Sequence, residues 1–293
     1  MNSPTNSAIR TVGIISKPNK EQICVVVPAL LEWLAQRGIR TICDTETASQ
    51  CAPGVASLSR EELPQKIDLL IVLGGDGTLL AAARLLGDRN VPILPVNLGA
   101  LGFLTSVTLN ELYPLLELLL EGKHRISERM MLEAEIVRGE KTISRHLALN
   151  DAVVTKSDLA RIIDLDVFVD GDLVGRFRAD GLIVATPTGS TAYSLSAGGP
   201  IIYPVHQSFV ITPICPHMLT NRPLVLSDSS KIEIQFVSGD EPARLTVDGQ
   251  VGVELFLNDR VVIRKAKNKV QLVRPPQKTY FEVLRNKLRW SER

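Results

Sequence analysis

One stretch of the chain, residues 69–80, constrains the fold more than any other. It begins with the apolar run Leu69–Leu73, which is short enough to be a buried strand, and continues with the turn Gly74-Gly75-Asp76-Gly77-Thr78. An apolar pattern with helical spacing starts at Leu79. The stretch therefore predicts a strand, a tight turn and a helix.

The predicted turn is suited to holding an anion. Glycine lets the backbone come close to a ligand, and the amides at the start of the following helix carry partial positive charge. Asp76 lies in the middle of this turn. Its carboxylate would repel a phosphate unless a metal ion bridges them or the acid acts on a hydroxyl group, which points to phosphoryl transfer. The alternative is that Asp76 is only an N-cap on a glycine-rich turn.

The segments around this turn alternate between strand and helix. The predicted strands are 12–16, 40–43, 69–73 and 91–96, and the predicted helices are 21–36, 79–86 and 110–122. Residues 45–65 are predicted to form a loop with a short helix near 59–62. The alternation predicts a parallel sheet, in which the loops 74–78 and 97–102 lie along one edge, where ligands bind.

After about residue 125 the helical spacing gives way to short β-rich runs separated by turns. The candidate strands are 130–137, 146–149, 162–169, 173–177, 182–185, 231–237, 244–247, 260–264 and 269–273. The predicted fold class is α/β + β. An N-terminal Rossmann-like parallel α/β domain, residues 1–125, precedes a C-terminal antiparallel β-sandwich domain, residues 126–293. The amphipathic segment 279–290 is expected to be a helix that packs back on the first domain.

A second informative segment runs from Asp180 to Pro200. Its strand-like start opens into a run with more hydroxyl groups and flexible backbone than a simple connection needs, so it can surround a polar ligand. The alternative is a solvated loop, with Asp180-Gly181 as a hairpin turn. Asn150-Asp151 and Asp248-Gly249-Gln250 also fit ordinary turns.

The composition excludes several classes of protein. The 293 residues include 33 basic and 32 acidic ones, a net charge of +1, so no general attraction to nucleic acid or to membranes is expected. The four cysteines include no Cys-x-x-Cys pair, which argues against a zinc ribbon and a disulfide scaffold and favours a reducing compartment. The sequence lacks the dinucleotide-binding Gly-x-Gly-x-x-Gly after the first strand, the P-loop, His-Glu-x-x-His and Gly-x-Ser-x-Gly.

Taken together, the segments resemble the NAD kinase family. The matching motifs are Gly74 to Thr78, Asn97 to Thr105, Asn150-Asp151, Thr186 to Tyr193 and Pro216-His217 to Leu224, in that order. The resemblance runs from about residue 12 to residue 290. It implies transfer of the γ-phosphoryl group of ATP to the 2'-hydroxyl of the adenosine ribose of NAD, giving NADP, with Mg²⁺ or another divalent metal ion.

The resemblance also implies a role for individual residues. Asp76 would be the catalytic base that takes the proton of the 2'-hydroxyl, and Asn150 and Asp151 would bind adenosine. The phosphates would be cradled by Gly74, Gly75, Gly77 and Thr78. Phe103 would line the pocket, and the rings of the dinucleotide would be surrounded by Thr191, Ala192, Tyr193 and Ser196. Asp180 would bind the nicotinamide end, and Arg178 is a candidate for phosphate contact or for discrimination between oxidised and reduced cofactor.

Two positions depart from the family's pattern. Val247 replaces the first glycine of Gly-Asp-Gly-Gln, which weakens any claim that this turn touches ligand, and Asp151 is shorter than the commoner Glu. The family resemblance further implies a homodimer or homotetramer acting on the small molecules NAD and ATP, and the cysteine usage leads us to expect a cytoplasmic location. Two other hypotheses remain: a lipid kinase of related fold, acting on diacylglycerol or a similar lipid, and a non-catalytic dinucleotide sensor.

Overall fold

The computed structural model describes residues 9–87, 89–99, 101–157, 162–218, 220–239 and 241–290. The chain divides into two compact units. Unit 1 comprises Met1–Glu128 and Val270–Arg293, and unit 2 comprises Arg129–Lys269. Each unit has its own hydrophobic core.

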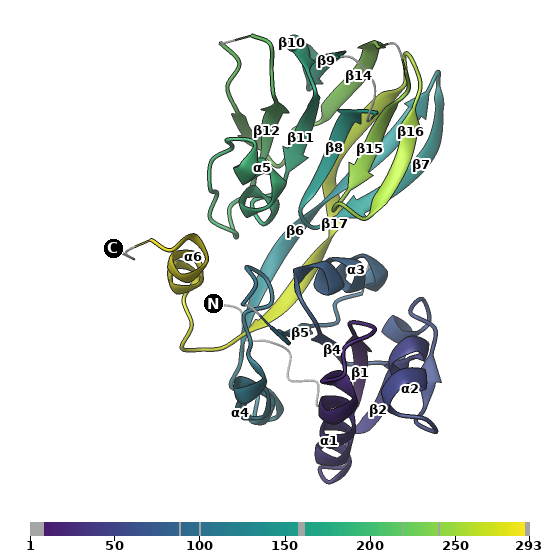
Figure 1. Cartoon of the computed structure of the whole chain (residues 1–293), viewed down its shortest axis with the longest axis vertical. Coiled ribbons are helices and arrows are strands. Elements are labelled where there is room, and N and C mark those ends of the chain that lie inside the picture. The colour runs from purple at the N-terminus through teal and green to yellow at the C-terminus, as the bar shows by residue number, and fades with distance from the viewer. Residues whose placement is uncertain are drawn as a thin grey trace. The chain divides into compact units, whose positions relative to one another are not determined.

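Unit 1 is built on a parallel sheet with the strand order β17-β5-β4-β1-β2-β3 (Figure 1). Its strands are β1 (Thr11–Ser16), β2 (Arg40–Asp44), β3 (Ser57–Leu58), β4 (Leu69–Leu73), β5 (Ile93–Val96) and the end of β17 (Arg260–Arg274). Its helices are α1 (Ile23–Ala35), α2 (Thr45–Cys51), the short 3-10 helix η1 (Leu63–Gln65), α3 (Asp76–Leu86), α4 (Leu109–Leu120) and α6 (Tyr280–Leu288). The predicted parallel α/β sheet is confirmed.

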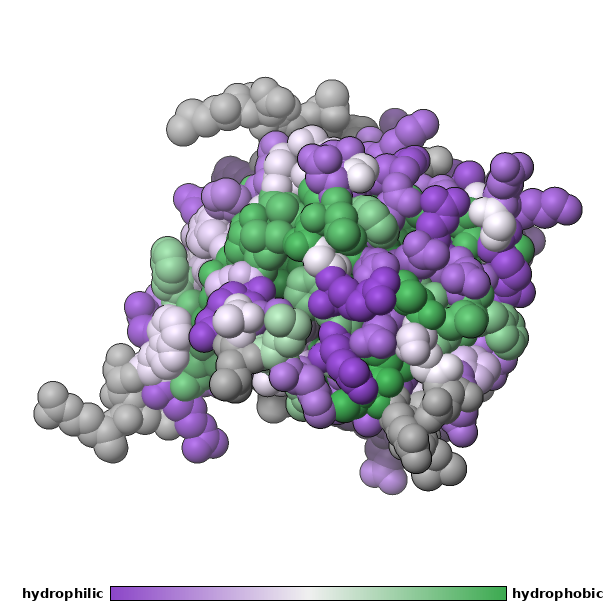
Figure 2. Space-filling model, turned by 90° about the horizontal axis from the view of Figure 1, so that it is seen from above, coloured by the Kyte–Doolittle hydropathy of each residue, from purple (hydrophilic) through white to green (hydrophobic). Residues whose placement is uncertain are grey.

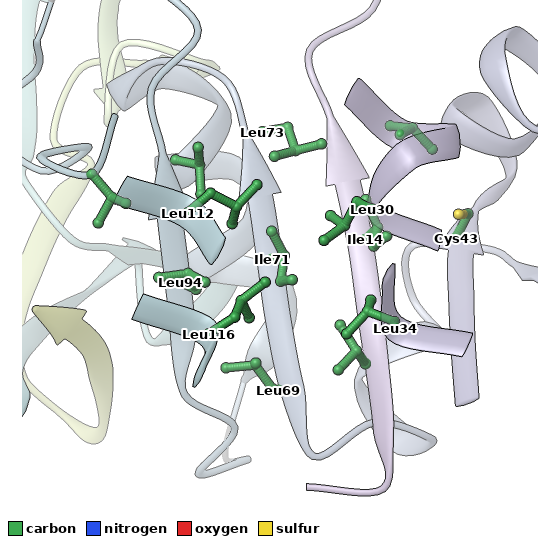
Figure 3. Packing of buried hydrophobic residues seen from close by; sticks show 14 of the residues in the cluster. Ile14, Leu30, Leu34, Cys43, Leu69, Ile71, Leu73, Leu94, Leu112 and Leu116 are labelled. Carbon is green, nitrogen blue, oxygen red and sulfur yellow. The ribbon is translucent and has the colours of Figure 1, made fainter. Parts of the chain in front are cut away.

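The core of unit 1 lies between the sheet and helices α1 and α4. Figure 3 shows Leu30 and Leu34 of α1 directed at Ile14 of β1, while Leu112 of α4 lies close to β4 and β5. Leu69, Ile71 and Leu73 of β4 share this face of the sheet because side chains alternate along a strand. Burial of each such side chain contributes about 1.5–3 kcal/mol. This packing holds β4 in place and so fixes the start of the turn that follows it.

The structure corrects the prediction for residues 45–65. Helix α2 was not predicted there, because its exposed positions are polar and its apolar stripe is short. Its signal was the cap: the side chain of Asp44 accepts a hydrogen bond from Thr47 N (3.1 Å), which satisfies a free amide of the first turn. The short helix expected near 59–62 is instead η1, which begins at Leu63.

Unit 2 is a sandwich of two antiparallel sheets (Figure 1). The first sheet contains β6 (Arg125–Arg138), β7 (Lys141–Ala148), β9 (Ile163–Val169), β10 (Asp172–Ala179), β14 (Ile232–Ser238) and the start of β17. The second has the order β13-β12-β11-β8-β15-β16, from β13 (Leu224–Ser227), β12 (Ser208–Ile214), β11 (Gly181–Ala185), β8 (Asp151–Lys156), β15 (Ala243–Val247) and β16 (Val251–Leu255). The predicted antiparallel β-sandwich is confirmed.

One core cluster joins the facing sides of the two sheets. It includes Leu165 and Ile234 from the first sheet and Val154, Leu182 and Leu245 from the second. The sequence predicted two strands at 260–264 and 269–273, but the structure has the single long strand β17. In unit 2, the strands β8, β12, β13 and β16 were not among the candidate strands. The opposite side of the second sheet, which faces away from this core, carries the site described below.

One pair of cysteines forms a disulfide, which was not predicted from the sequence. Cys24 of α1 and Cys51 of α2 form a disulfide, with their Cα atoms 4.5 Å apart, whereas Cys43 and Cys215 are free. Sequence spacing alone does not reveal this pair, because its members lie on separate helices. A single link between two helices of unit 1 supplements a hydrophobic core rather than replacing it.

The surface mixes hydrophilic and hydrophobic residues. Figure 2 shows a group of hydrophobic residues within one face, bordered by hydrophilic ones. Within the described ranges, no helix combines the length and the apolar character needed to cross a bilayer.

Candidate functional site

The glycine-rich turn of unit 1 joins β4 to α3. Gly74 N donates to Val96 O (2.9 Å), which ties the turn to the end of the neighbouring strand β5. A methyl group on Gly74 would lie 2.5 Å from Thr78 Oγ1, whereas nothing lies within 4 Å of the corresponding position on Gly75. The turn is therefore packed on the Gly74 side and open at Gly75, where a ligand can reach the backbone at the positive end of α3.

Asp76 is the first residue of α3, and the cap position belongs to Gly75. Its side chain accepts hydrogen bonds from the loop after β5: Phe103 N donates to Oδ2 (3.0 Å), and Leu104 N and Thr105 N donate to Oδ1 (3.2 and 2.9 Å). Thr105 Oγ1 also lies 2.8 Å from Oδ1. The alternative that Asp76 only caps its own helix is wrong, because its carboxylate binds a different segment.

This contact requires glycine at position 102. A methyl group there would overlap Asp76 Oδ1 and Thr105 Oγ1. The ring of Phe103 is half-buried and lies 5.7 Å from Lys287 Nζ of α6. The loop thus places Phe103 next to Asp76. In the first turn of α3, Gly77 is exposed and Thr78 is half-buried.

A separate pocket of about 330 Å³ lies on unit 2. Its lining is Asn150, Asp151, Val153, Thr155, Ala192, Tyr193, Thr246, Asp248 and Gly249. Asp151, Val153 and Thr155 are alternate residues of β8, so they face the same side of the sheet. Val153 pairs with Thr246 of β15, which brings that side chain to the same face. The pocket therefore unites four predicted site residues: Asn150, Asp151, Ala192 and Tyr193. It also includes Thr246, which only the strand pairing identifies.

The turn Asp248-Gly249 closes the hairpin between β15 and β16, as predicted. Both residues have positive φ angles, 50° and 66°, which the tight turn requires. The buried carboxylate of Asp248 accepts hydrogen bonds from Leu149 N (3.2 Å), Asn150 N (2.8 Å) and Asp151 N (3.3 Å). The turn thus lines the pocket and also holds the backbone that carries the Asn-Asp pair.

Asn150 and Asp151 present unusual polar groups in this pocket. Asn150 Oδ1 is buried and has no hydrogen-bond partner among the described residues, which costs about 1–3 kcal/mol unless a ligand supplies a donor. Burial raises the pKa of Asp151 to about 7, and the nearby charge of Asp248 adds to the effect. At neutral pH the carboxyl group can therefore both donate and accept hydrogen bonds.

The segment after β11 uses many of its hydroxyl groups internally. Thr186 Oγ1 donates to Leu149 O (2.6 Å), and Ser190 Oγ donates to Pro187 O (2.7 Å). The hydroxyls of Ser194 and Thr212 are 2.9 Å apart. The hydroxyl-rich composition thus reflects internal packing as well as any contact with ligand. Tyr193 and Ser196 are exposed and Thr191 is half-buried.

Four of the predicted site residues in unit 2 do not line this pocket. Arg178, Asp180, Thr191 and Ser196 are not among the described residues that line it. Asp180 forms an ion pair with Lys156 (2.8 Å), and Arg178 is exposed at the end of β10. Both residues flank the start of β11, the strand that leads into the Thr186–Tyr193 segment.

The raised pKa of Asp151 gives a prediction on stability. A group whose folded-state pKa lies above its unfolded value of 3.8 contributes stability that is full below pH 3.8 and is lost as the pH rises through about 7. At about 1.4 kcal/mol per unit, the loss is on the order of 4 kcal/mol. Asp151→Asn cannot ionise, so its melting temperature should rise relative to the unmodified protein between pH 4.5 and 8.5. A difference that stays constant across this range in thermal melts would contradict the prediction.

A parallel α/β unit with a glycine-rich turn before a helix, joined to a β unit with a small polar pocket, is typical of proteins that bind nucleotides. Comparison with known proteins narrows this class. Residues 12–124 match the family described as the ATP-NAD kinase N-terminal domain, and residues 149–275 match the ATP-NAD kinase C-terminal domain. The chain belongs to the NAD kinase family.

Individual relatives agree with this assignment. The NAD kinase of Solibacter usitatus is 53% identical, covering 97% of this chain and 99% of its own length, and that of Geobacter metallireducens is 49% identical, covering 97% and 100%. Yeast NADH kinase complexed with NADH superposes with a TM-score of 0.90 at 27% identity, covering 98% of this chain and 90% of its own. An NAD kinase from Archaeoglobus fulgidus in complex with ATP gives a TM-score of 0.77 at 28% identity, covering 95% and 98%. These matches favour the NAD kinase hypothesis over a lipid kinase.

Proposed function

We propose that this chain transfers the γ-phosphoryl group of ATP to the 2'-hydroxyl of NAD with Asp76 as the catalytic base. The observation that carries the proposal is the position of Asp76: it lies at the N-terminus of α3, beside the open backbone of Gly75, with its carboxylate held by the loop of residues 103–105. The proposal places an anion-binding turn and a proton acceptor on adjacent residues.

In this reaction the protein contributes mainly by positioning the reacting groups. The oxygen of the 2'-hydroxyl forms a bond to the γ-phosphorus, its proton passes to the Asp76 carboxylate, and the bond from the γ-phosphorus to the β,γ-bridging oxygen breaks with its electron pair going to ADP. A placed base contributes about 10²- to 10⁴-fold to such a reaction. Gly74, Gly75, Gly77 and Thr78 are proposed to cradle the phosphates through backbone and hydroxyl donors.

A divalent metal ion fits this site only together with the triphosphate. Within the described parts of the chain, no group of three or more His, Cys, Asp and Glu side chains could hold a metal. Mg²⁺ is commonly bound by one or two carboxylates and by substrate phosphates, so the ion is proposed to arrive on ATP. When bound, it would neutralise charge on the transferring phosphoryl group.

The pocket of unit 2 is proposed to bind the adenosine of NAD. The exocyclic amine of adenine is a donor that could satisfy Asn150 Oδ1, and the ribose hydroxyls are partners for Asp151. Tyr193 and Ala192, which line the same pocket, offer apolar surface to a ring. The rest of the dinucleotide is proposed to involve Phe103, Arg178, Asp180, Thr191 and Ser196.

The cellular setting is also a proposal. A cytoplasmic location would give the enzyme access to both ATP and NAD. Assembly into a homodimer or homotetramer is proposed on the family resemblance, and gel filtration with light scattering would test it.

Purified protein incubated with NAD, ATP and Mg²⁺ is expected to produce NADP, measured by coupling to a dehydrogenase specific for NADP. Omission of ATP or of the metal ion should each reduce the signal to the blank. A panel of other nucleotides, polyphosphate and NADH in place of the standard substrates would define the breadth of donor and acceptor. The absence of NADP above the blank, in a preparation that binds NAD, would instead support the sensor hypothesis.

A further inference from the structure

The two oxygens of the Asp76 carboxylate are held unequally. Oδ1 has three neighbouring donors, namely Leu104 N, Thr105 N and Thr105 Oγ1, at 3.2, 2.9 and 2.8 Å. Oδ2 has one donor among the described residues, Phe103 N, at 3.0 Å. A carboxylate oxygen offers about two lone-pair directions, so Oδ1 is saturated while Oδ2 retains acceptor capacity.

The hydroxyl of Thr105 is itself oriented by a second side chain. Asn97 Nδ2 donates to Thr105 Oγ1 (2.8 Å), and Asn97 Oδ1 accepts a hydrogen bond from Gly99 N (2.6 Å). The second contact sets which end of the amide is the nitrogen, because only the oxygen can accept. The amide nitrogen of Asn97 cannot accept a hydrogen bond from the Thr105 hydroxyl. That hydroxyl therefore donates to Asp76 Oδ1, which belongs to a carboxylate that can only accept. Both Asn97 and Thr105 are buried, at 7% and 0% exposure, which protects the chain of hydrogen bonds from water.

We propose that Asn97 and Thr105 are positioning residues that anchor Asp76 through Oδ1, so that Oδ2 is the oxygen that receives the proton of the acceptor hydroxyl. The proposal rests on the function proposed above, because it needs Asp76 to act as the base. It adds two residues that touch no substrate and act through Asp76. It also assigns the proton transfer to one particular oxygen atom.

The arrangement has a physical advantage for the reaction. A carboxylate that rotates freely must be ordered each time the hydroxyl approaches, and hydrogen bonds that already hold it remove that cost beforehand. All four donors come from the consecutive residues 103–105, and three of them are backbone amides. Glycine at position 102 lets this loop approach Asp76. The Thr105 hydroxyl is the one side-chain donor among them, so substitution can remove it without deleting a backbone amide.

The test compares Thr105→Val with Thr105→Ser. Valine has the shape of threonine and lacks the hydroxyl, whereas serine keeps it. Thr105→Val is expected to lower kcat for NADP formation about 10- to 100-fold with KM for NAD and ATP within about threefold, and Thr105→Ser is expected to restore kcat to within about threefold of the unmodified enzyme. Unchanged kcat in Thr105→Val, or an equal loss in both variants, would overturn the proposal.

Two further variants keep the proposal testable if valine impairs folding. Asn97→Ser removes the donor to Thr105 and should lower kcat about 3- to 10-fold, again with KM nearly constant. In the double variant Asp76→Asn/Thr105→Val, loss of Thr105 should cost no further activity, because its effect passes through Asp76. Additive losses would overturn the proposal. If the unmodified enzyme forms no NADP, the proposed function fails. An active enzyme that is insensitive to these changes rejects the positioning roles alone.

Discussion

Asp76→Asn should lower kcat by about 10²- to 10⁴-fold while the affinity for NAD stays within a few-fold of the unmodified enzyme. Asparagine replaces one carboxylate oxygen by an NH₂ group. The three donors around Oδ1 favour the amide oxygen at that position, so the NH₂ group would take the place of Oδ2. The variant therefore loses the proposed base. Its NH₂ group would also face Phe103 N, so that two hydrogen-bond donors meet.

Steady-state kinetics with the coupled NADP assay and calorimetric titration of NAD would measure the two effects separately. Asp68→Asn is a matched control, because Asp68 also accepts two backbone hydrogen bonds, from Arg10 N (2.9 Å) and Thr11 N (2.8 Å), but is exposed. It should lower stability slightly and leave kcat unchanged. Equal kcat in Asp76→Asn and the unmodified enzyme would remove Asp76 as the base.

The fold was predictable where local patterns coincide with burial. The run Leu69–Leu73 followed by glycines could only be a buried strand and a turn, and the alternation of strands and helices fixed the parallel sheet. Strand β12 is also fully buried, but it escaped prediction because Thr212 and Pro213 interrupt its apolar run. Helix α2 escaped because its stability comes from a cap and from packing rather than from an apolar stripe.

The pocket was predictable only in part, because some of its residues are brought together by contacts that are distant in the sequence. Asn150 and Asp151 stand out as a polar pair in the sequence, and Tyr193 belongs to a recognisable motif. Thr246 has no local signal: it reaches the pocket because β15 pairs with β8, a long-range contact that the sequence does not display. Nor does composition reveal that the hydroxyl of Thr186 binds a backbone carbonyl, since only the folded chain shows which groups are already satisfied.

The segment that follows β11 packs closely against the backbone of Asn150 at Gly189. A methyl group there would overlap the backbone carbonyl of Asn150. Backbone atoms cannot rotate out of the way as the end of a flexible side chain can. Thr186 N donates to the same carbonyl (2.8 Å), so the segment must shift away from a group to which it is bonded. Gly189→Ala is therefore expected to lower the free energy of unfolding by about 3 kcal/mol and to weaken NAD binding at least about 10-fold.

Urea denaturation and calorimetric titration of NAD would measure both changes. Gly99→Ala is the matched control: its added methyl group would lie 3.6 Å from its nearest neighbour, Lys20 Nζ, which is ordinary contact. It should leave the free energy of unfolding within about 0.5 kcal/mol. If Gly189→Ala were as stable as this control and bound NAD normally, the contact with Asn150 would not determine the shape of the pocket. If only binding were lost, the segment would yield locally, and the Asn150 backbone would move without unfolding the sandwich.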